Sequence, residues 1–224
     1  MKKSLRELCS CYKALTTMVV YFVIYMTAFG YLEQRKTSYY VIHFGIDAYI
    51  PFCEYFIVPY LLWFAYVALA VIYFGIKDQD EGNKLVAFLI AGMTIFLIVS
   101  AVFPNGHHLR PKTFERDNIF VDMVKKLYIV DTSTNVVPSI HVYNSIAVMI
   151  TVWRTKLLKN HRVIKVGLML LGVTIICSTV LLKQHSMLDV MVAFILGALV
   201  YTICYREEVA ARPSVSRAKA KLKV

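Results

Sequence analysis

The sequence predicts an all-α integral membrane protein with six transmembrane helices, and three observations lead to that prediction. Of the 224 residues, 58% are hydrophobic and 17% are charged, which is more apolar than a soluble domain of this length needs for its core. The hydrophobic residues form uncharged blocks of roughly bilayer length rather than amphipathic stripes. Lys and Arg residues cluster in the connections beside these blocks, as signals of membrane topology do.

The apolar blocks divide the chain into one membrane domain, residues 14–205, between a basic leader, 1–13, and a basic tail, 206–224. The first block is longer than the apolar core of a usual signal peptide, and no small-residue cleavage site follows it. We therefore interpret it as a retained span. The six predicted spans are 14–32, 51–76, 85–103, 138–153, 163–182 and 187–205.

The longest connection, residues 104–137, contains a predicted interfacial helix. Within residues 117–128 the apolar side chains recur at roughly helical spacing, with charged residues between them. Such an amphipathic stretch is typical of a helix that lies on a membrane surface.

The distribution of cations predicts the orientation of the chain. If both termini are cytosolic, 17 of the 25 Lys and Arg residues fall on the inner side, as the positive-inside rule requires. The ends of the spans at 103, 138, 182 and 187 then share the outer face. We expect a multi-pass protein of the plasma membrane, with any site at these ends on the extracytoplasmic side.

The net charge of +11 does not indicate a nucleic-acid partner, because the cations flank apolar blocks. The expected partners are membrane lipids. The five Cys residues show no disulfide or zinc spacing. Nothing in the sequence indicates an oligomeric state.

Two helix starts on the predicted outer face carry polar side chains, and the first begins at Pro138. Proline suits the first position of a helix, and the unpaired N–H groups of a helix start attract anions. His141 would stand in that first turn beside a bound anion. We expect Asn135 and Ser139, together with the backbone N–H groups, to add neutral phosphate-binding donors.

The second helix start carries Lys183, His185 and Asp189, and His185 and Asp189 are four residues apart on one helical face. His185 can attack phosphorus through one ring nitrogen while Asp189 holds the other, and His141 can protonate the departing oxygen. Arg110 and Lys183 are the predicted charged phosphate ligands. This chemistry needs no metal and no cofactor.

Taken singly, each residue also has an ordinary structural interpretation. A histidine at a helix start is usually a polar end group, Arg110 can anchor a lipid headgroup, and Lys183 can extend along apolar surface. His107 and His108 read better as loop residues than as ligands. Two further acidic residues have structural interpretations, Glu54 as a buried, hydrogen-bonded carboxyl and Asp47 as a helix cap. The conjunction of two histidine-bearing helix starts and an Arg-Pro on one face favours a site.

The order of these groups resembles the type 2 phosphatidic acid phosphatase/haloperoxidase superfamily, in its membrane lipid-phosphatase branch. That family carries Lys-x6-Arg-Pro, Pro-Ser-x-His and Ser-Arg-x5-His-x3-Asp. The second motif is complete at 138–141, and the third keeps its Ser, His and Asp at 178, 185 and 189. The first survives as Arg110-Pro111. The motif Lys is replaced by Phe103 and the motif Arg by Thr179.

The resemblance implies that His185 is the nucleophile, that Asp189 is its partner, and that His141 is the acid that later activates the acceptor. The implied substrate is a lipid phosphate or pyrophosphate such as phosphatidate, phosphatidylglycerol phosphate or a polyprenyl pyrophosphate. The form Pro-Ser-Ile-His also resembles the sphingolipid-headgroup and inositol phosphotransferase side of the family.

Three other functions remain open at the level of sequence. A lipid phosphotransferase would use the same phosphohistidine chemistry with an alcohol as acceptor. A transporter or non-catalytic scaffold would place ionisable groups along a path through the membrane. A metal-dependent hydrolase would use His107, His108, His141 and His185 as ligands.

Overall fold

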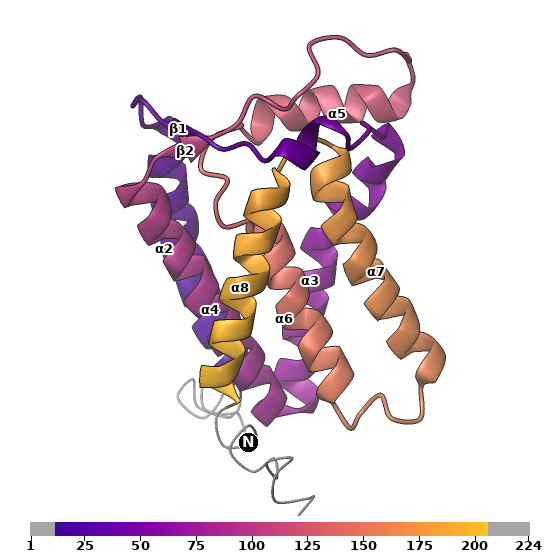
Figure 1. The fold of residues 1–224 in the computed structure, drawn as a ribbon. Helices are drawn as coiled ribbons and strands as arrows, with labels where there is room; N and C mark the ends of the chain where they lie inside the picture. The colour runs from indigo at the N-terminus through magenta and orange to yellow at the C-terminus, as the bar shows by residue number, and fades with distance from the viewer. Residues whose placement is uncertain (1–11, 206–224) are drawn as a thin grey trace, which may run out of the picture.

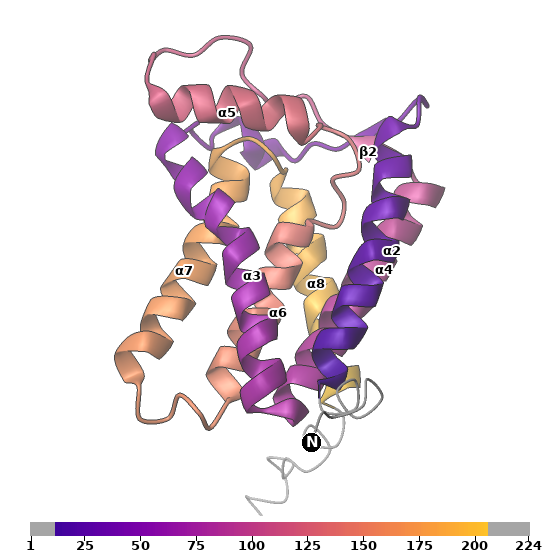
Figure 2. The ribbon, with the colours of Figure 1, turned by 180° about the vertical axis from the view of Figure 1, so that it is seen from behind.

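The computed structural model describes residues 12–205, which form a bundle of long helices crossed at one end by a shorter one (Figures 1 and 2). The crossing helix is α5, Ile119–Val130. The long helices are α2 (Lys13–Gln34), α3 (Ile57–Lys77), α4 (Gln79–Val102), α6 (Ile140–Arg154), α7 (Arg162–Leu181) and α8 (Met187–Cys204).

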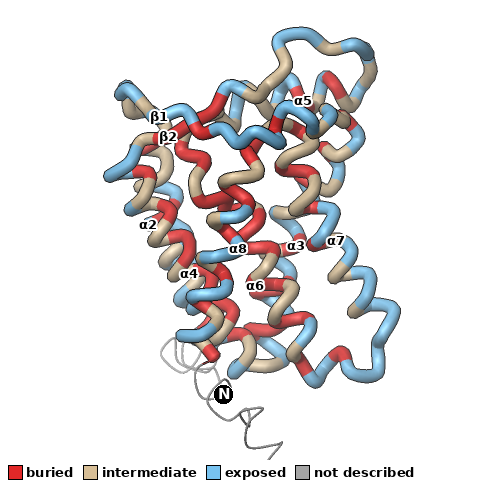
Figure 3. Tube along the Cα trace, viewed as in Figure 1, coloured by how far each residue is buried: buried red, intermediate tan, exposed pale blue. Residues whose placement is uncertain are grey.

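Five helices of the described chain are long and apolar enough to cross a bilayer. They are Lys13–Gln34, Glu54–Lys77, Gln79–Val102, Arg162–Leu181 and Met187–Cys204. Each lies within a few residues of a predicted span, because long uncharged blocks leave the backbone no better way to satisfy its polar groups in lipid. Many of their large apolar side chains are exposed on the outside of the bundle, as Figure 3 shows for α7. This surface suits contact with acyl chains.

The structure supports five of the six predicted spans, and the difference lies in α6. This helix has 15 residues and is therefore about 22 Å long, short of the roughly 30 Å of a bilayer core. The chain leaving α5 descends as an irregular segment, residues 131–139, so α6 starts deeper in the bundle than the point where α3 starts or α7 ends (Figures 1 and 2). The predicted span, residues 138–153, is nearly as short as α6, so the helix keeps its predicted bounds and the irregular segment supplies the depth that the helix lacks.

The predicted interfacial helix is present as α5, which lies across the end of the bundle near the starts of α6 and α8 (Figure 1). Asn118 caps it by accepting hydrogen bonds from the N–H groups of Phe120 and Val121. Its buried Val124 packs in a small cluster with Ile57, Tyr60 and Leu182. Contact between α5 and a membrane stays a prediction.

The connection between α2 and α3 runs across the same end and contributes one strand of a small two-stranded sheet. A two-residue strand, β1 (Tyr40–Val41), pairs in parallel with β2 (Asn105–Gly106), which follows α4. Two short 3-10 helices follow, η1 (Gly45–Ala48) and η2 (Glu54–Phe56). This connection therefore covers the end of the bundle where the predicted site residues lie.

The first residue of α2 and the last residue of α8 lie at the opposite end of the bundle from α5 (Figure 1). This agrees with the prediction that the two ends of the membrane domain share one side. That this side is cytosolic stays a prediction. The predicted leader and tail lie largely outside the described residues.

Candidate active site

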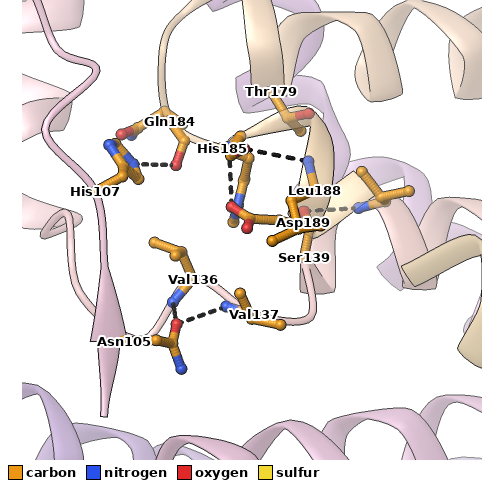
Figure 4. Close-up of polar contacts among 12 residues, drawn as sticks. Asn105, His107, Val136, Val137, Ser139, Thr179, Gln184, His185, Leu188 and Asp189 are labelled. Atoms are coloured by element: carbon orange, nitrogen blue, oxygen red, sulfur yellow. Dashed lines mark hydrogen bonds and ion pairs between the residues drawn. The ribbon is translucent and has the colours of Figure 1, made fainter. Parts of the chain in front are cut away.

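The start of α8 holds a histidine–carboxylate pair (Figure 4). Asp189 is fully buried, and its Oδ2 accepts hydrogen bonds from Nδ1 of His185 at 3.2 Å and from the backbone N–H of Ser186 at 2.9 Å. Ser186 is the N-cap of the helix, so the aspartate completes a capping box while it orients the histidine. The i, i+4 spacing predicted this pair.

The pairing leaves the other ring nitrogen of His185 available. Because Nδ1 donates its proton to the carboxylate, Nε2 keeps its lone pair. The backbone N–H of His185 is held by the carbonyl oxygen of Thr179 at 3.0 Å. His185 is 8% exposed, so its ring has little contact with bulk solvent. A buried, oriented imidazole of this kind can act as a nucleophile or a base.

His141 lies opposite this pair in the first turn of α6. Its ring centroid is 5.9 Å from that of His185. Two aromatic rings of α3 flank it, Tyr60 at 4.5 Å and Trp63 at 4.2 Å between centroids. The structure therefore brings together the three residues predicted as catalytic, His141, His185 and Asp189.

The segment before α6 is held by Asn105, which follows α4. Its side-chain Oδ1 accepts hydrogen bonds from the N–H groups of Val136 at 2.8 Å and Val137 at 2.9 Å (Figure 4). Its backbone carbonyl accepts a further bond from the N–H of Asn135. These bonds satisfy the irregular backbone that enters the bundle and fix the position of the α6 start.

Asn135 and Ser139, predicted as neutral phosphate donors, have structural partners here. Asn135 has a φ of 53° and donates from Nδ2 to Glu33 of α2 at 2.7 Å. The hydroxyl of Ser139 caps α6 by accepting from the N–H of Val142 at 3.4 Å. The backbone N–H of Ser139 points to the carbonyl of Asp189 at 3.5 Å, so the two helix starts touch. Phosphate binding by either residue stays a prediction.

Arg110 lies at the same end of the bundle and joins α5 to the turn before α8. Its guanidinium donates to the carbonyls of Tyr128 at 3.0 Å, Asp131 at 2.6 Å and Thr132 at 2.8 Å, and to the side chain of Gln184. It also lies over the ring of Tyr128, 4.4 Å from the centroid. Burial lowers the pKa of Arg110, although the nearby Asp131 opposes that shift.

Lys183, the second predicted charged phosphate ligand, is held by the connection between α2 and α3. Its Nζ donates to the carbonyl of Asp47 at 2.8 Å and to that of Ile50. Burial lowers the pKa of Lys183, and the charge of Asp47 partly offsets this effect. A phosphate-binding role for Lys183, as for Arg110, stays a prediction, because carbonyl oxygens occupy both cations in this structure.

Asp47 itself caps α8, although it belongs to η1. Its carboxylate accepts hydrogen bonds from the N–H of Met187 at 2.8 Å, the hydroxyl of Ser186 and the N–H of Phe44. Burial alone would raise the pKa of Asp47, but these hydrogen bonds outweigh it and lower the pKa. The prediction that Asp47 is a cap is therefore confirmed. Glu54 is likewise buried and bonded to Arg116 and Asn118, as predicted.

His107 and His108 play different parts, and neither joins a metal-binding group. His107 is fully buried, and its Nε2 lies 2.7 Å from the carbonyl of Gln184 while Nδ1 accepts from the N–H of Leu109. Burial lowers the pKa of His107 to about 4, so the ring is neutral at neutral pH. His108 is exposed beside the ring of Tyr39. No group of three metal ligands occurs within the described residues.

The two positions that depart from the motifs have other roles. Phe103 ends α4 and stacks on Tyr40 at 4.7 Å between ring centroids. Thr179 is fully buried near the end of α7, where its carbonyl accepts from the N–H groups of both Gln184 and His185 at 3.0 Å (Figure 4). An uncharged residue suits this buried position.

A bundle of helices suited to a membrane, with two histidines and an aspartate at two touching helix starts, defines an α-helical membrane protein with a candidate phosphate-processing site. Residues 109–212 match the family model of the PAP2 superfamily. The match supports membership of the chain in that superfamily, which its motifs predicted. Searches of curated proteins and of solved structures found no significant match. Membership supports a phosphatase or haloperoxidase type of activity, and in general a phosphoric ester hydrolase.

Sequence reasoning did not find the aromatic side chains and the loop anchors of the site. In the sequence, Tyr60 and Trp63 look like ordinary residues of a span. Their rings lie against His141, and the hydroxyl of Tyr60 also donates to Asp131 at 2.7 Å. Asn105 and Glu33 lie far along the chain from the residues they hold. A polar residue just after a span is the one signal that would have pointed to Asn105.

Proposed function

We propose that the protein is a metal-independent membrane lipid phosphatase that works through a phosphohistidine intermediate. The observation that supports this most is the arrangement of His185, bonded to Asp189 through Nδ1, with His141 across from it. One imidazole is oriented for attack and a second is placed to handle a proton, which are the two functions that phosphate ester cleavage requires.

In the proposed first step, Nε2 of His185 forms a bond to phosphorus while the bond from phosphorus to the lipid oxygen breaks. His141 gives its proton to that departing oxygen, and Asp189 stabilises the positive charge that develops on the ring of His185. In the second step His141 takes a proton from water, the oxygen of water bonds to phosphorus, and the bond to Nε2 breaks. Inorganic phosphate leaves, and both histidines return to their starting states.

The negative phosphate oxygens need donors, and those at hand are the N–H groups at the start of α6 together with Arg110 and Lys183. Both side chains bond to carbonyl oxygens here, so substrate binding would exchange some of these bonds for bonds to phosphate. A lipid suits the site, because the flanking rings of Tyr60 and Trp63 belong to an apolar helix of the bundle. Phosphatidate, phosphatidylglycerol phosphate and polyprenyl pyrophosphate are the substrates to test.

We further propose that the site faces the extracytoplasmic side of the plasma membrane and that α6 completes a six-span domain. The excess of Lys and Arg in the sequence segments assigned to the cytosol supports this orientation. A transporter is disfavoured, because the charged side chains of the described long helices lie near helix ends rather than along their middles.

A lipid phosphotransferase is the second candidate, favoured by the enclosure of the site. His185 is nearly buried and aromatic rings flank His141, an arrangement that limits the access of water and suits an alcohol acceptor. The acceptor would then take the place of water in the second step.

The test is phosphate release by purified protein from the three lipids in the presence of a chelator. We expect the wild type to release phosphate and His185→Ala to release none. The wild type should also form an acid-labile phosphorylated protein, and the variant should not. His161→Ala, at an exposed histidine between α6 and α7, is the control and should keep full activity. Full release by His185→Ala would refute the nucleophile, and headgroup transfer to an added alcohol without phosphate release would establish the transferase.

A further inference from the structure

The end of the bundle opposite α5 contains a cavity that the proposed reaction does not use. It lies where α6 ends and α7 begins and has a volume of about 660 Å³. Figures 1 and 2 place this connection far from the starts of α6 and α8. Its lining divides into a cationic rim and an apolar wall.

The rim carries five cations: Arg154, Lys156, Lys159, Arg162 and Lys165. Two of them are engaged by the bundle. Arg154 lies over the ring of Tyr205 and near Glu81, and Lys165 donates to the carbonyl of Trp153. Lys156, Lys159 and Arg162 are exposed, and within residues 12–205 no acidic side chain forms an ion pair with them. The rim therefore presents uncompensated positive charge.

The wall is a stripe of apolar side chains on α7. Val166, Leu170 and Val173 recur at helical spacing and are 56%, 60% and 45% exposed. Trp153 stands at the rim, 68% exposed, with Nζ of Lys165 4.8 Å from its ring centroid. Figure 3 shows this part of α7 as largely exposed. An exposed tryptophan beside cations, with an apolar stripe running away from them, is the pattern found where a membrane meets water.

We propose that this cavity binds an anionic phospholipid, with its phosphate among Lys156, Lys159 and Arg162 and an acyl chain along the α7 stripe. Charge complementarity selects the headgroup, since three cations of the rim form no ion pair with an acidic side chain of residues 12–205. The apolar wall selects a lipid over a free anion. Free phosphate could satisfy the rim but would leave the wall exposed. The site lies on the opposite side from the proposed substrate site and would take a resident lipid rather than a substrate.

The chain offers its own reporter, because it contains two tryptophans, Trp63 and Trp153. In a Trp63→Phe protein Trp153 is the sole tryptophan, and brominated lipid next to it quenches its fluorescence. The protein is placed in vesicles of equal parts phosphatidylglycerol and phosphatidylcholine. In one set the phosphatidylglycerol carries the bromine, and in the other the phosphatidylcholine does. The ratio of the two quenching efficiencies measures which headgroup sits at Trp153.

We expect brominated phosphatidylglycerol to quench Trp153 more strongly, with a relative affinity of at least about fivefold, the contribution of a single cation near anionic lipid. Lys156→Ala/Lys159→Ala should lower this preference at least about fivefold, because it removes two of the three cations. The matched pair Lys13→Ala/Lys77→Ala removes the same charge at the same end of the bundle, outside the cavity lining, and should leave the preference unchanged. Near-ultraviolet circular dichroism of each variant checks that the fold is kept.

Three results would overturn the proposal. Equal quenching by the two lipids in the unaltered rim would show that no anionic lipid is selected. If both double variants lost the preference for phosphatidylglycerol equally, the preference would come from the general attraction of a basic surface for anionic lipid and not from the cavity. The tail contains an acidic pair, Glu207 and Glu208. A lipid preference that appears only in Glu207→Gln/Glu208→Gln would show that this pair, and not a lipid, occupies the cationic rim of the wild-type protein.

Discussion

Asp47 caps helix α8 from 140 residues away, with its carboxylate oxygen 2.8 Å from the backbone N–H of Met187. The neighbouring residues extend this contact, since the hydroxyl of Ser186 donates to the same carboxylate and Lys183 donates to the carbonyl of Asp47. His185 lies between these anchored positions. Its orientation therefore depends on the connection between α2 and α3 as well as on Asp189.

Replacing Asp47 tests this dependence. In Asp47→Asn the cap loses its charge and at least one hydrogen bond, a loss of about 1.5–3 kcal/mol for bonds to a charged group. If Asp47 acts as a positioning residue for His185, the kcat of Asp47→Asn should fall while its KM stays within about twofold of the wild type. Both constants are measured well below the melting temperature of the variant. Asp122→Asn, at an exposed pair with Lys125, is the control and should change neither. A lower melting temperature with unchanged kcat would limit Asp47 to a structural part.

Glycine at position 92 is required by the close approach of α4 and α6. A Cβ there would lie 2.0 Å from the ring of Tyr143, and that ring is fixed because its hydroxyl donates to the carbonyl of Phe88. Gly92→Ala should lower stability in detergent by about 1–3 kcal/mol, the usual cost of overpacking a core. Thermal unfolding measures this loss.

The matched control for that substitution is Gly167→Ala on α7. A Cβ at Gly167 meets nothing within 4 Å, so the variant should be as stable as the wild type or slightly more stable, since alanine favours a helix. Equal melting temperatures for the two variants would contradict the packing seen between α4 and α6.

His107 should make the fold sensitive to acid. Burial lowers its pKa from 6.5 to about 4, so the unfolded chain binds a proton more readily than the folded protein between these values. The stabilisation is complete above pH 6.5 and is lost as the pH falls towards 4. It amounts to about 3 kcal/mol in all.

His107→Gln keeps a polar side chain at this position but cannot titrate. We expect the variant to be less stable than the wild type at pH 7 and to lose less stability on acidification to pH 4.5, as measured by thermal unfolding in detergent. His161→Ala should show the full acid sensitivity of the wild type. The same acid-induced loss in His107→Gln would assign the sensitivity to other groups.

Lys183 can be tested as a phosphate ligand through inhibition by vanadate, which mimics transferring phosphate. If its ammonium exchanges carbonyl oxygens for phosphate oxygens, Lys183→Ala should weaken vanadate inhibition by about tenfold, the loss of one charge-assisted contact. Lys36→Ala, at an exposed lysine after α2, should leave inhibition unchanged. If Lys183→Ala were less stable but equally inhibited by vanadate, the role of Lys183 would be structural, namely to hold the connection between α2 and α3.

Much of this arrangement could be predicted from local patterns in the sequence. The pairing of His185 with Asp189 follows from their spacing on a helix, and each long apolar block became a helix near its predicted bounds. Pro138 was predicted to be the first residue of a helix, but α6 begins two residues later, at Ile140, with Ser139 as its N-cap. His141 still lies in the first turn, as predicted. These features depend on neighbouring residues, so the sequence displays them directly.

The remaining features depend on contacts between distant residues. The depth at which α6 begins depends on the segment before it, whose backbone is satisfied by Asn105, and the apolar pattern of residues 138–153 contains no trace of that bond. The partners of Arg110 and Lys183 are backbone carbonyls, which every residue carries and no motif marks. Charge alone suggested phosphate for these two cations, whereas the fold gives each of them a structural bond.

The dependence of α8 on Asp47 has a consequence for which parts of the chain the site requires. The match to the superfamily covers residues 109–212, yet Asp47 and Glu33 lie outside it and hold the two segments that carry the histidines. The matched region therefore does not carry the whole site. Transferred without residues 1–108, nearly half of the chain, it would keep both histidines but lose the side chains that orient them.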